Sequence, residues 1–298
     1  MSRVGLRAGQ SRTRALENRQ GSGEFMTVEL RPIMRDCPNC GADAPRDLGL
    51  GRQPWTIGAC SPCGFAYLTA AASYADLSEY YSWDKAIIIE AKRRKKAQPI
   101  VQWLDQNTRW RLHLFPRPET RTFLQTLVPS GKVVDIGCGS GKQGWALPDS
   151  YTPYGVEISH TLADEADTAF AARGGACQHA PSAEGLNKFD ADMFDGAMLN
   201  SYLEHEAEPL PVLKALHRVL KPAGVAVVKV PNFASWNAAV MKKNWCGIRL
   251  PDHVNYFTPN SLMKMAEAAG FTVEFPKMTN LPTNDNFWAF LRPAPPQA

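Results

Sequence analysis

"VVDIGCGSGKQG", running from Val133 to Gly144, is the most informative stretch of this 298-residue chain. An apolar run leads directly into a group of glycines, which is the pattern of a strand that turns sharply into a helix. The glycines fit two patterns: G-x-G-x-x-G beginning at Gly139, and D-x-G-x-G-x-G beginning at Asp135. Both predict a turn whose backbone approaches a ligand closely, but they predict different ligands.

The side chain of Asp135 separates the two ligands. G-x-G-x-x-G is the pattern of a dinucleotide-binding turn, where a carboxylate in the strand would face the pyrophosphate unfavourably. S-adenosylmethionine instead carries a sulfonium and an ammonium group, and a nearby carboxylate stabilises both. Glu157, twenty residues after Gly137 in "YGVEIS", suits the ribose hydroxyls of either ligand. Asp135 therefore favours S-adenosylmethionine.

From Lys132 onward, short apolar runs alternate with helical patterns. The predicted strands are 132–136, 153–157, 194–199, 225–230, 271–275 and 286–292, with a weaker one at 176–179. The predicted helices are 141–147, 160–172, 209–220 and 259–269, the last with Thr258 as N-cap, Pro259 at N1 and Gly270 after its end. This alternation predicts an α/β, doubly wound, mostly parallel seven-stranded sheet over residues 129–298. Residues 73–128 are expected to form a helical linker or cap.

The N-terminal part carries four cysteines in two pairs, Cys37-x2-Cys40 and Cys60-x2-Cys63, with nineteen residues between the pairs. Four thiolates at this spacing suit tetrahedral zinc, so we expect a zinc ribbon over 26–72; free buried thiols are the alternative. A closed four-thiolate site has no open coordination position, which assigns the zinc to folding rather than catalysis. The other three cysteines are scattered and odd in number, and no secretion signal is present, so a reducing cytoplasmic setting is expected.

The overall composition is that of a soluble globular protein, with 44% hydrophobic and 21% charged residues. No apolar run of about 18 residues exists, so no membrane span is expected. The net charge of +4 is too mild to indicate a nucleic-acid partner, and the basic run Lys92–Lys96 is typical of a solvated helix face. Residues 1–25 read as a disordered tail or, because "GSGEF" precedes Met26, as a remnant of cloning.

Four motifs, "VVDIGCGSG", "YGVEIS", "FDGAMLNSYLEH" and "LHRVLKPAGVAVVKVPN", resemble class I S-adenosylmethionine-dependent methyltransferases in order and spacing. The resemblance covers residues 132–275 and implies a Rossmann-like methyltransferase fold and that cofactor. It places Asp135, Gly137, Gly139 and Gly141 at the methionine end, Glu157 at the ribose, Ser182, Ala183 and Glu184 near the adenine, and Asn200 and Tyr202 at the carboxyl edge of the sheet. The family usually has an acidic residue where Ser182 stands, so this chain departs from the pattern there.

Two histidines are the candidates for catalysis. Methyl transfer from a sulfonium is an in-line displacement, and a hydroxyl acceptor also needs a base for its proton, a task that histidine suits. His205 follows the fourth strand in "SYLEHE", and His253 lies in the loop "RLPDHVNYFTPNSL" before the capped helix. Each also has a structural interpretation, as part of a helix start and as a fixed loop residue. Trp245, Asn255 and Tyr256 either line the same region or are ordinary packing residues.

Further resemblances bear on the acceptor. "DHVNYFTPNSL…AGF" resembles bacterial methyltransferases of polysaccharide and sugar-nucleotide pathways, and the cysteine ribbon resembles that of zinc-bearing sugar C-methyltransferases. Because the long third domain of the latter is lacking, O-methylation of a small-molecule or sugar-type acceptor is the expectation. The alternatives are a zinc-ribbon RNA methyltransferase, which the basic run would favour, a protein methyltransferase, and a non-catalytic binding module that retains the fold. No Asn-Pro-Pro-Tyr sequence is present, which argues against methylation of a base amine.

Overall fold

The computed structural model of the chain describes residues 32–71, 119–276 and 280–295. The predicted tail 1–25, the basic run Lys92–Lys96 and most of the predicted helical segment 73–128 lie outside these ranges. None of the helices within the described ranges has both the length and the hydropathy needed to cross a membrane.

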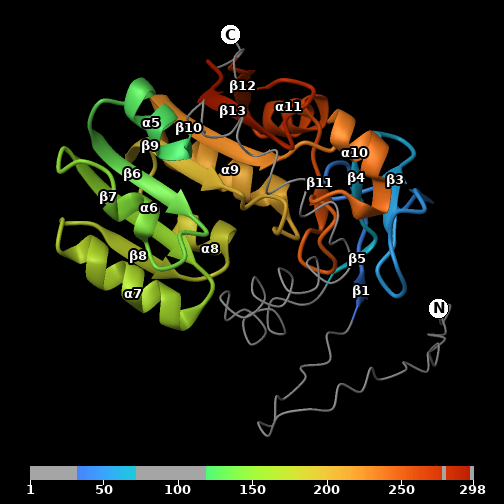
Figure 1. Ribbon diagram of the computed structural model, residues 1–298. Coiled ribbons are helices and arrows are strands. Elements are labelled where there is room, and N and C mark those ends of the chain that lie inside the picture. Colours follow the sequence, from blue (N-terminus) through green and yellow to red (C-terminus); the bar gives the residue numbers. More distant parts are fainter. Residues whose placement is uncertain (1–31, 72–118, 277–279, 296–298) are drawn as a thin grey trace, which may run out of the picture.

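A seven-stranded sheet forms the centre of the molecule, with the strand order β12-β13-β10-β9-β6-β7-β8 (Figure 1). Strands β6 to β10 pair with one another in parallel, and β13 runs antiparallel to both β10 and β12. The strands are β6 (Gly131–Ile136), β7 (Tyr151–Glu157), β8 (Ala176–His179), β9 (Phe194–Asn200), β10 (Leu220–Pro231), β12 (Phe271–Glu274) and β13 (Asn286–Pro293). All seven predicted strands are present, which confirms the mostly parallel α/β sheet.

Both faces of the sheet are covered because successive strand residues point to opposite sides. Val133 and Met198 pack with Leu124 on one face, whereas Val134 and Leu199 join the cluster on the other. The first face carries α5 (Thr120–Leu127), α6 (Lys142–Trp145) and α7 (His160–Ala171), and the second carries α8 (Ser182–Asn187), α9 (Pro209–Val219) and α11 (Pro259–Ala268). The sheet is therefore doubly wound, as predicted.

The predicted start of α11 is confirmed in atomic detail. Thr258 Oγ1 accepts from the Ser261 backbone N–H at 3.1 Å, and Ser261 Oγ accepts from the Thr258 N–H at 2.9 Å. This reciprocal capping box satisfies two N–H groups that the helix itself leaves without partners. Two short helices that the sequence analysis did not predict are α8 and α10 (Trp236–Met241), the latter followed by a 3-10 turn, η1 (Lys242–Asn244).

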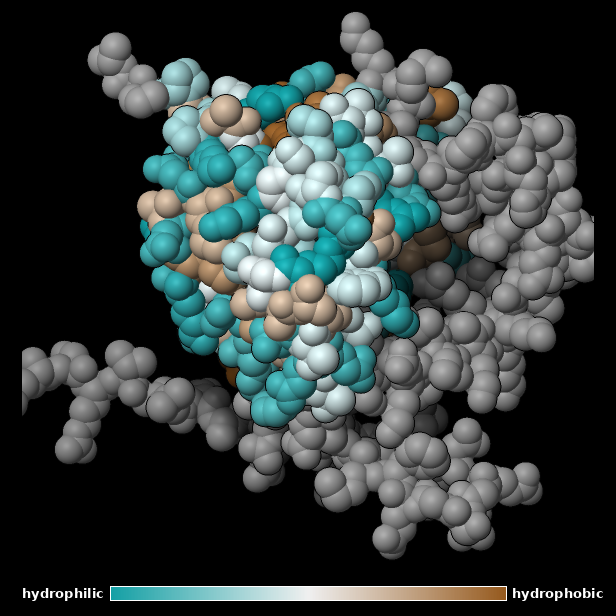
Figure 2. Space-filling view, turned by 90° about the vertical axis from the view of Figure 1, so that its left-hand side faces the viewer, coloured by the Kyte–Doolittle hydropathy of each residue, from teal (hydrophilic) through white to brown (hydrophobic). Residues whose placement is uncertain are grey.

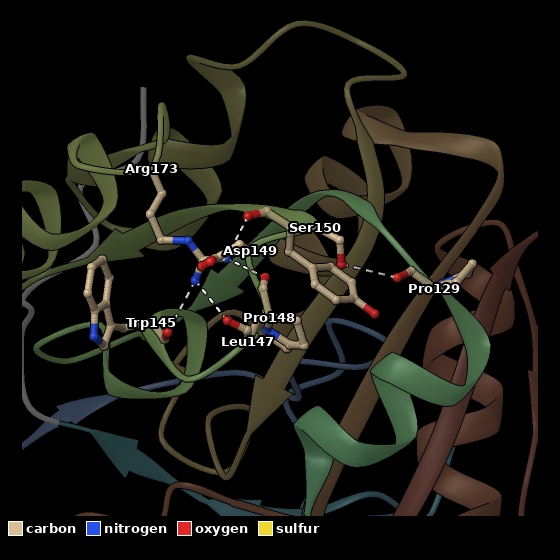
Figure 3. A network of polar contacts seen from close by, with 8 residues as sticks. Pro129, Trp145, Leu147, Pro148, Asp149, Ser150 and Arg173 are labelled. Atoms are coloured by element: carbon tan, nitrogen blue, oxygen red, sulfur yellow. Dashed lines mark hydrogen bonds and ion pairs between the residues drawn. The ribbon is translucent and has the colours of Figure 1, made fainter.

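The loop between α6 and β7 is held by Arg173, which follows α7 (Figure 3). Its guanidinium donates to the carbonyl oxygens of Trp145 at 3.1 Å, Leu147 at 2.9 Å and Tyr151 at 2.9 Å, and also to that of Pro148. Arg173 thus supplies donors to carbonyls that the short helix α6 cannot satisfy.

The outer side of α7 is polar, and the face of the molecule that carries this helix is correspondingly hydrophilic (Figure 2).

A smaller antiparallel sheet lies beside the large one, in the order β11-β4-β3-β2 (Figure 1). Its strands are β2 (Pro45–Asp47), β3 (Ile57–Cys60), β4 (Ala66–Leu68) and β11 (Asn255–Tyr256), and a separate pair joins β1 (Ile33–Met34) to β5 (Ala70–Ala71). Strand β11 comes from the loop before α11, so a segment almost 190 residues away in sequence completes the sheet of the cysteine ribbon. The sequence analysis did not predict this pairing.

Candidate active site

The glycine turn joins β6 to α6 at the carboxyl edge of the sheet. Gly137, Gly139 and Gly141 have φ values of +67°, +54° and +77°, a left-handed conformation that residues with a Cβ rarely adopt. A Cβ on Gly137 would overlap the Tyr202 ring, whereas a Cβ on Gly139 would meet no atom of the described residues within 4 Å. The turn is therefore closed on the Tyr202 side and open at Gly139, where a ligand can approach the backbone.

Two carboxyl groups stand behind this turn. Glu157 Oε2 accepts from the Gly139 backbone N–H at 2.9 Å, and its Oε1 accepts from the Ser159 N–H at 2.9 Å. Asp135 is 3% exposed, and burial, followed by repulsion from Glu157, raises its pKa to about 7. Two buried carboxyl groups of like charge fit a ligand with positive charge, as the sulfonium and ammonium of S-adenosylmethionine would provide. The turn thus fits the cofactor that Asp135 predicted.

Tyr202 connects the glycine turn to the predicted adenine region. Its hydroxyl donates to the Glu206 carboxylate, and a hydrogen bond with Ser182 partly offsets the burial that raises the pKa of Tyr202. Ser182 is buried at the start of α8, whereas Ala183 is half-buried and Glu184 is exposed. The structure therefore brings Gly137, Ser182 and Tyr202 together.

Asn200 has a different position. It ends β9, and its Oδ1 accepts from Thr120 Oγ1 at 2.8 Å, which ties the side chain to α5.

The two candidate histidines, 48 positions apart in sequence, lie against each other. Their ring centroids are 4.7 Å apart at an interplanar angle of 89°. His205 Nδ1 lies 2.9 Å from the Asp252 carbonyl oxygen, and His253 Nδ1 lies 2.9 Å from that of Gly247. Because a carbonyl only accepts, each Nδ1 carries a hydrogen, and in a neutral ring the lone pair is then on Nε2. Burial lowers the pKa of His205 to about 3, so its ring is neutral at physiological pH.

Glu204 is a member of this group that the sequence analysis missed. Its side chain is 1% exposed, and among the described residues its Oε2 has no hydrogen-bond partner. Burial raises its pKa to about 8, opposed by its own backbone N–H and by the charges of Lys229 and Arg249. One ligand atom from each of Glu204, His205 and His253 lies within 4.8 Å of the others. The available signal in the sequence was a carboxylate directly beside His205, just after the end of a strand.

The four paired cysteines also converge. Cys37 Sγ lies 3.5 Å from Cys63 Sγ, Cys40 Sγ lies 3.5 Å from Cys60 Sγ, and all four sulfurs are within 4.8 Å of one another. Sulfurs bound tetrahedrally at about 2.3 Å from zinc are separated by about 3.8 Å, so the arrangement fits a four-thiolate zinc site. None of the four forms a disulfide.

The cysteine ribbon contacts the loop that carries His253. Arg35 donates to the Val254 carbonyl at 3.3 Å and to Asn255 Oδ1 at 3.2 Å, and the Leu68 N–H donates to the same Val254 carbonyl at 2.8 Å. On its other side, Val254 donates its N–H to the Glu204 carbonyl at 2.7 Å. The loop is therefore held between the ribbon and the segment that follows β9.

The aromatic and amide residues near this loop are packing residues. Trp245, Asn255 and Tyr256 are 2%, 2% and 3% exposed. Trp245 Nε1 donates to Asp285 Oδ1 at 2.7 Å, and the Asn255 amide donates to the Leu203 carbonyl at 2.8 Å. Of the two interpretations in the sequence analysis, the structure supports packing.

Comparison with known proteins places residues 108–274 in a family described as a methyltransferase domain. A ubiquinone biosynthesis O-methyltransferase of Thiobacillus denitrificans is 28% identical over 184 residues, covering 58% of this chain and 79% of that protein. A ubiquinone biosynthesis O-methyltransferase of Psychrobacter arcticus is 29% identical over 160 residues, and the match covers 47% of this chain and 59% of that protein. A crystal structure from Thermotoga maritima, described as a possible histamine N-methyltransferase, is 22% identical to this chain with a TM-score of 0.46. The match covers 64% of this chain and 96% of that one.

Proposed function

Because this chain belongs to the methyltransferase family that its residues 108–274 match, we propose that it methylates a hydroxyl group of a small-molecule or sugar-type acceptor. It is an S-adenosylmethionine-dependent methyltransferase, so the open question is the acceptor. The observation that carries the proposal is the contact between the rings of His205 and His253. His205 donates its backbone N–H to the carbonyl of Tyr202, whose ring covers the glycine turn. The curated relatives that match are named O-methyltransferases, which agrees with a hydroxyl acceptor.

The residues of the glycine turn have distinct tasks in this proposal. When bound, S-adenosylmethionine supplies an electrophilic methyl group on a sulfonium. Asp135 compensates its positive charge, Glu157 holds the Gly139 backbone in place and accepts from the ribose, and Tyr202 closes the turn on one side. The adenine lies along Ser182, Ala183 and Glu184 at the start of α8.

The histidine pair acts on the acceptor. With each Nδ1–H directed to a backbone carbonyl, the two Nε2 atoms are the positions that hold or receive the proton of the acceptor hydroxyl. Burial lowers the pKa of His205 to about 3, so this ring is only weakly basic, and we assign the proton of the acceptor hydroxyl to His253. His205 then orients the acceptor rather than taking its proton.

We also propose that the four cysteines bind a structural zinc ion. The spacing of their sulfurs fits tetrahedral zinc, and a four-thiolate site leaves no position for a substrate. The ion would stabilise residues 26–72 and, through the contacts of Arg35 and β4, the loop with His253.

The test is methyl transfer by His253→Ala and His205→Ala, with His160→Ala as the matched control. His160 is an exposed histidine of α7, with 73% of its side chain accessible. A panel of phenols, sugars and nucleotide-sugars is assayed with isotopically labelled S-adenosylmethionine, and cofactor affinity is measured by calorimetry. We expect about a 100-fold or greater loss of turnover in the two variants with cofactor affinity unchanged. Turnover at the wild-type rate in both variants contradicts the proposal, as does transfer to RNA alone or cofactor binding with no turnover on any acceptor.

A further inference from the structure

Two of the three cysteines outside the ribbon lie together at the glycine turn. Cys138 stands between Gly137 and Gly139, and Cys177 lies on β8, 39 positions further along the chain. Their sulfurs are 3.6 Å apart, and neither cysteine forms a disulfide. We propose that this pair is a reversible oxidation site, in which a disulfide between Cys138 and Cys177 lowers the affinity for S-adenosylmethionine.

Gly155 allows the two sulfurs to meet. It lies on β7 and is the register partner of Cys177 on β8 (Figure 1). A Cβ on Gly155 would lie 2.6 Å from Cys138 Sγ and 3.2 Å from Cys177 Sγ, so a larger residue would occupy the space that the sulfurs share. The Phe170 ring, 2.9 Å from the same Cβ position, borders this space from α7. The pair is therefore held in contact within a small apolar cluster.

The two thiols differ in their access to an oxidant. Cys138 is 8% exposed, whereas Cys177 is half-buried. The hydrogen bond with Cys177, followed by burial, raises the pKa of Cys138, which keeps this thiol protonated. We therefore assign the first reaction with hydrogen peroxide to Cys177.

The oxidation has two steps. In the first, Cys177 Sγ takes a hydroxyl group from the peroxide as the O–O bond breaks, which gives a sulfenic acid and one water. In the second, Cys138 Sγ attacks that sulfur, the S–S bond forms, and the hydroxyl group leaves with the Cys138 proton as a second water. Two thiols are oxidised to one disulfide and one peroxide is reduced to two waters. A dithiol reductant reverses the change by thiol–disulfide exchange.

Forming the bond requires movement at the glycine turn. The sulfurs must approach from 3.6 Å to about 2.05 Å. On the β8 side the backbone is held by the strand pairing, and the Cys177 N–H donates to Asp167 Oδ1 at 2.8 Å. On the turn side the Cys138 N–H donates to the Val156 carbonyl at a longer 3.3 Å. We therefore expect the turn to take up most of the movement and to displace the Gly139 backbone, where the ligand approaches.

Cofactor binding and oxidation then oppose each other by the same factor. If the disulfide weakens cofactor binding tenfold, bound cofactor disfavours the disulfide tenfold at equilibrium, because coupling between two sites is reciprocal. This reciprocity distinguishes a coupled site from two thiols that are merely close. The proposal concerns the cofactor and not the acceptor, so a failed search for a hydroxyl substrate leaves its test unaffected.

The experiment treats the full-length, zinc-loaded protein with hydrogen peroxide and locates disulfides by peptide mass mapping. After removal of the peroxide, calorimetry measures the affinity for S-adenosylmethionine, and metal analysis verifies that the ribbon keeps its zinc. We expect a Cys138–Cys177 disulfide, about a tenfold or greater loss of affinity, and recovery with a dithiol reductant. Recovery separates the disulfide from sulfinic and sulfonic acids, which such a reductant does not reverse. In a glutathione buffer, added cofactor should lower the fraction of disulfide.

Cys177→Ser and Cys246→Ser form a matched pair of variants. Each removes one cysteine outside the ribbon, but Cys246 is exposed and follows η1. We expect oxidised Cys246→Ser to lose affinity as the wild type does, and oxidised Cys177→Ser to keep it.

Three outcomes overturn the proposal. The first is a wild type that forms no Cys138–Cys177 disulfide under conditions that oxidise Cys246, and the second is a disulfide that leaves cofactor affinity unchanged. The third is an equal, reversible loss of affinity in folded, oxidised Cys177→Ser. The first two need only the wild type, so they decide even if a variant fails to fold.

Discussion

At the scale of single residues, Gly137 is fixed by conformation and by contact together. Its φ is +67°, and a Cβ there would overlap the Tyr202 ring. We expect Gly137→Ala to cost about 1–2 kcal/mol in backbone strain and about 1–3 kcal/mol in overpacking, and to weaken cofactor binding about tenfold or more. The control is Gly174→Ala, where φ is +75° but no atom lies within 4 Å of the added Cβ. Chemical denaturation and calorimetry measure both effects; equal losses in the two variants would contradict the contact with Tyr202.

A second prediction for a single residue concerns pH. Burial and Glu157 raise the pKa of Asp135 from 3.8 to about 7, so the folded protein holds this proton over a range where the unfolded chain has released it. The contribution of Asp135 to stability therefore falls as pH rises between these values. A cationic cofactor requires the ionised form, so its affinity should rise with pH, by up to about tenfold per unit below pH 7. Calorimetry at pH 6 and 8 checks this, and Asp135→Asn should bind weakly with little pH dependence.

At the scale of the elements, Arg173 connects the end of α7 to the loop between α6 and β7. It bonds to four backbone carbonyls, and 10% of its side chain is exposed. We expect Arg173→Ala to lower the free energy of unfolding by about 2–4 kcal/mol, since four backbone carbonyls, two of them in part-buried hydrogen bonds, lose a charged donor. Arg121→Ala is the comparison: its ion pair with Glu119 is exposed and is worth about 0–1 kcal/mol. Similar thermal shifts in the two variants would show that the Arg173 network adds no more than a surface pair.

At the scale of the whole molecule, the cysteine ribbon supports the histidine loop. Strand β11, two residues after His253, pairs with β4, and Arg35 bonds to the same segment. We expect Cys60→Ser to lose zinc and most methyl transfer, while cofactor affinity changes by less than about threefold, because the glycine turn lies in the other sheet. Metal analysis measures the zinc content, calorimetry the cofactor affinity and a turnover assay the methyl transfer. Full turnover in the zinc-free variant would contradict the dependence of the histidine loop on the ribbon.

The large sheet was predictable from local patterns. The short apolar runs of buried strands such as β9, the glycines after β6 and the capping residues around α11 act over a few positions, so their preferences are visible in a short stretch. Helices α8 and α10, with six residues each, are too short for a clear period and, unlike α6, do not follow a glycine turn, so they were not predicted. The spacing of the cysteine pairs likewise predicted that the four sulfurs lie together.

The arrangement of the candidate site required the tertiary structure. His205 and His253 are far apart in the chain, and the sequence around either residue does not indicate that their rings are in contact. The carbonyls of Asp252 and Gly247 determine that Nδ1 carries the hydrogen in each ring. Among the described residues Glu204 Oε2 has no hydrogen-bond partner, and this depends on which segments bury it. Local sequence records which side chains prefer to be buried or to turn the chain; which buried groups meet is decided only when distant strands, such as β4 and β11, pair.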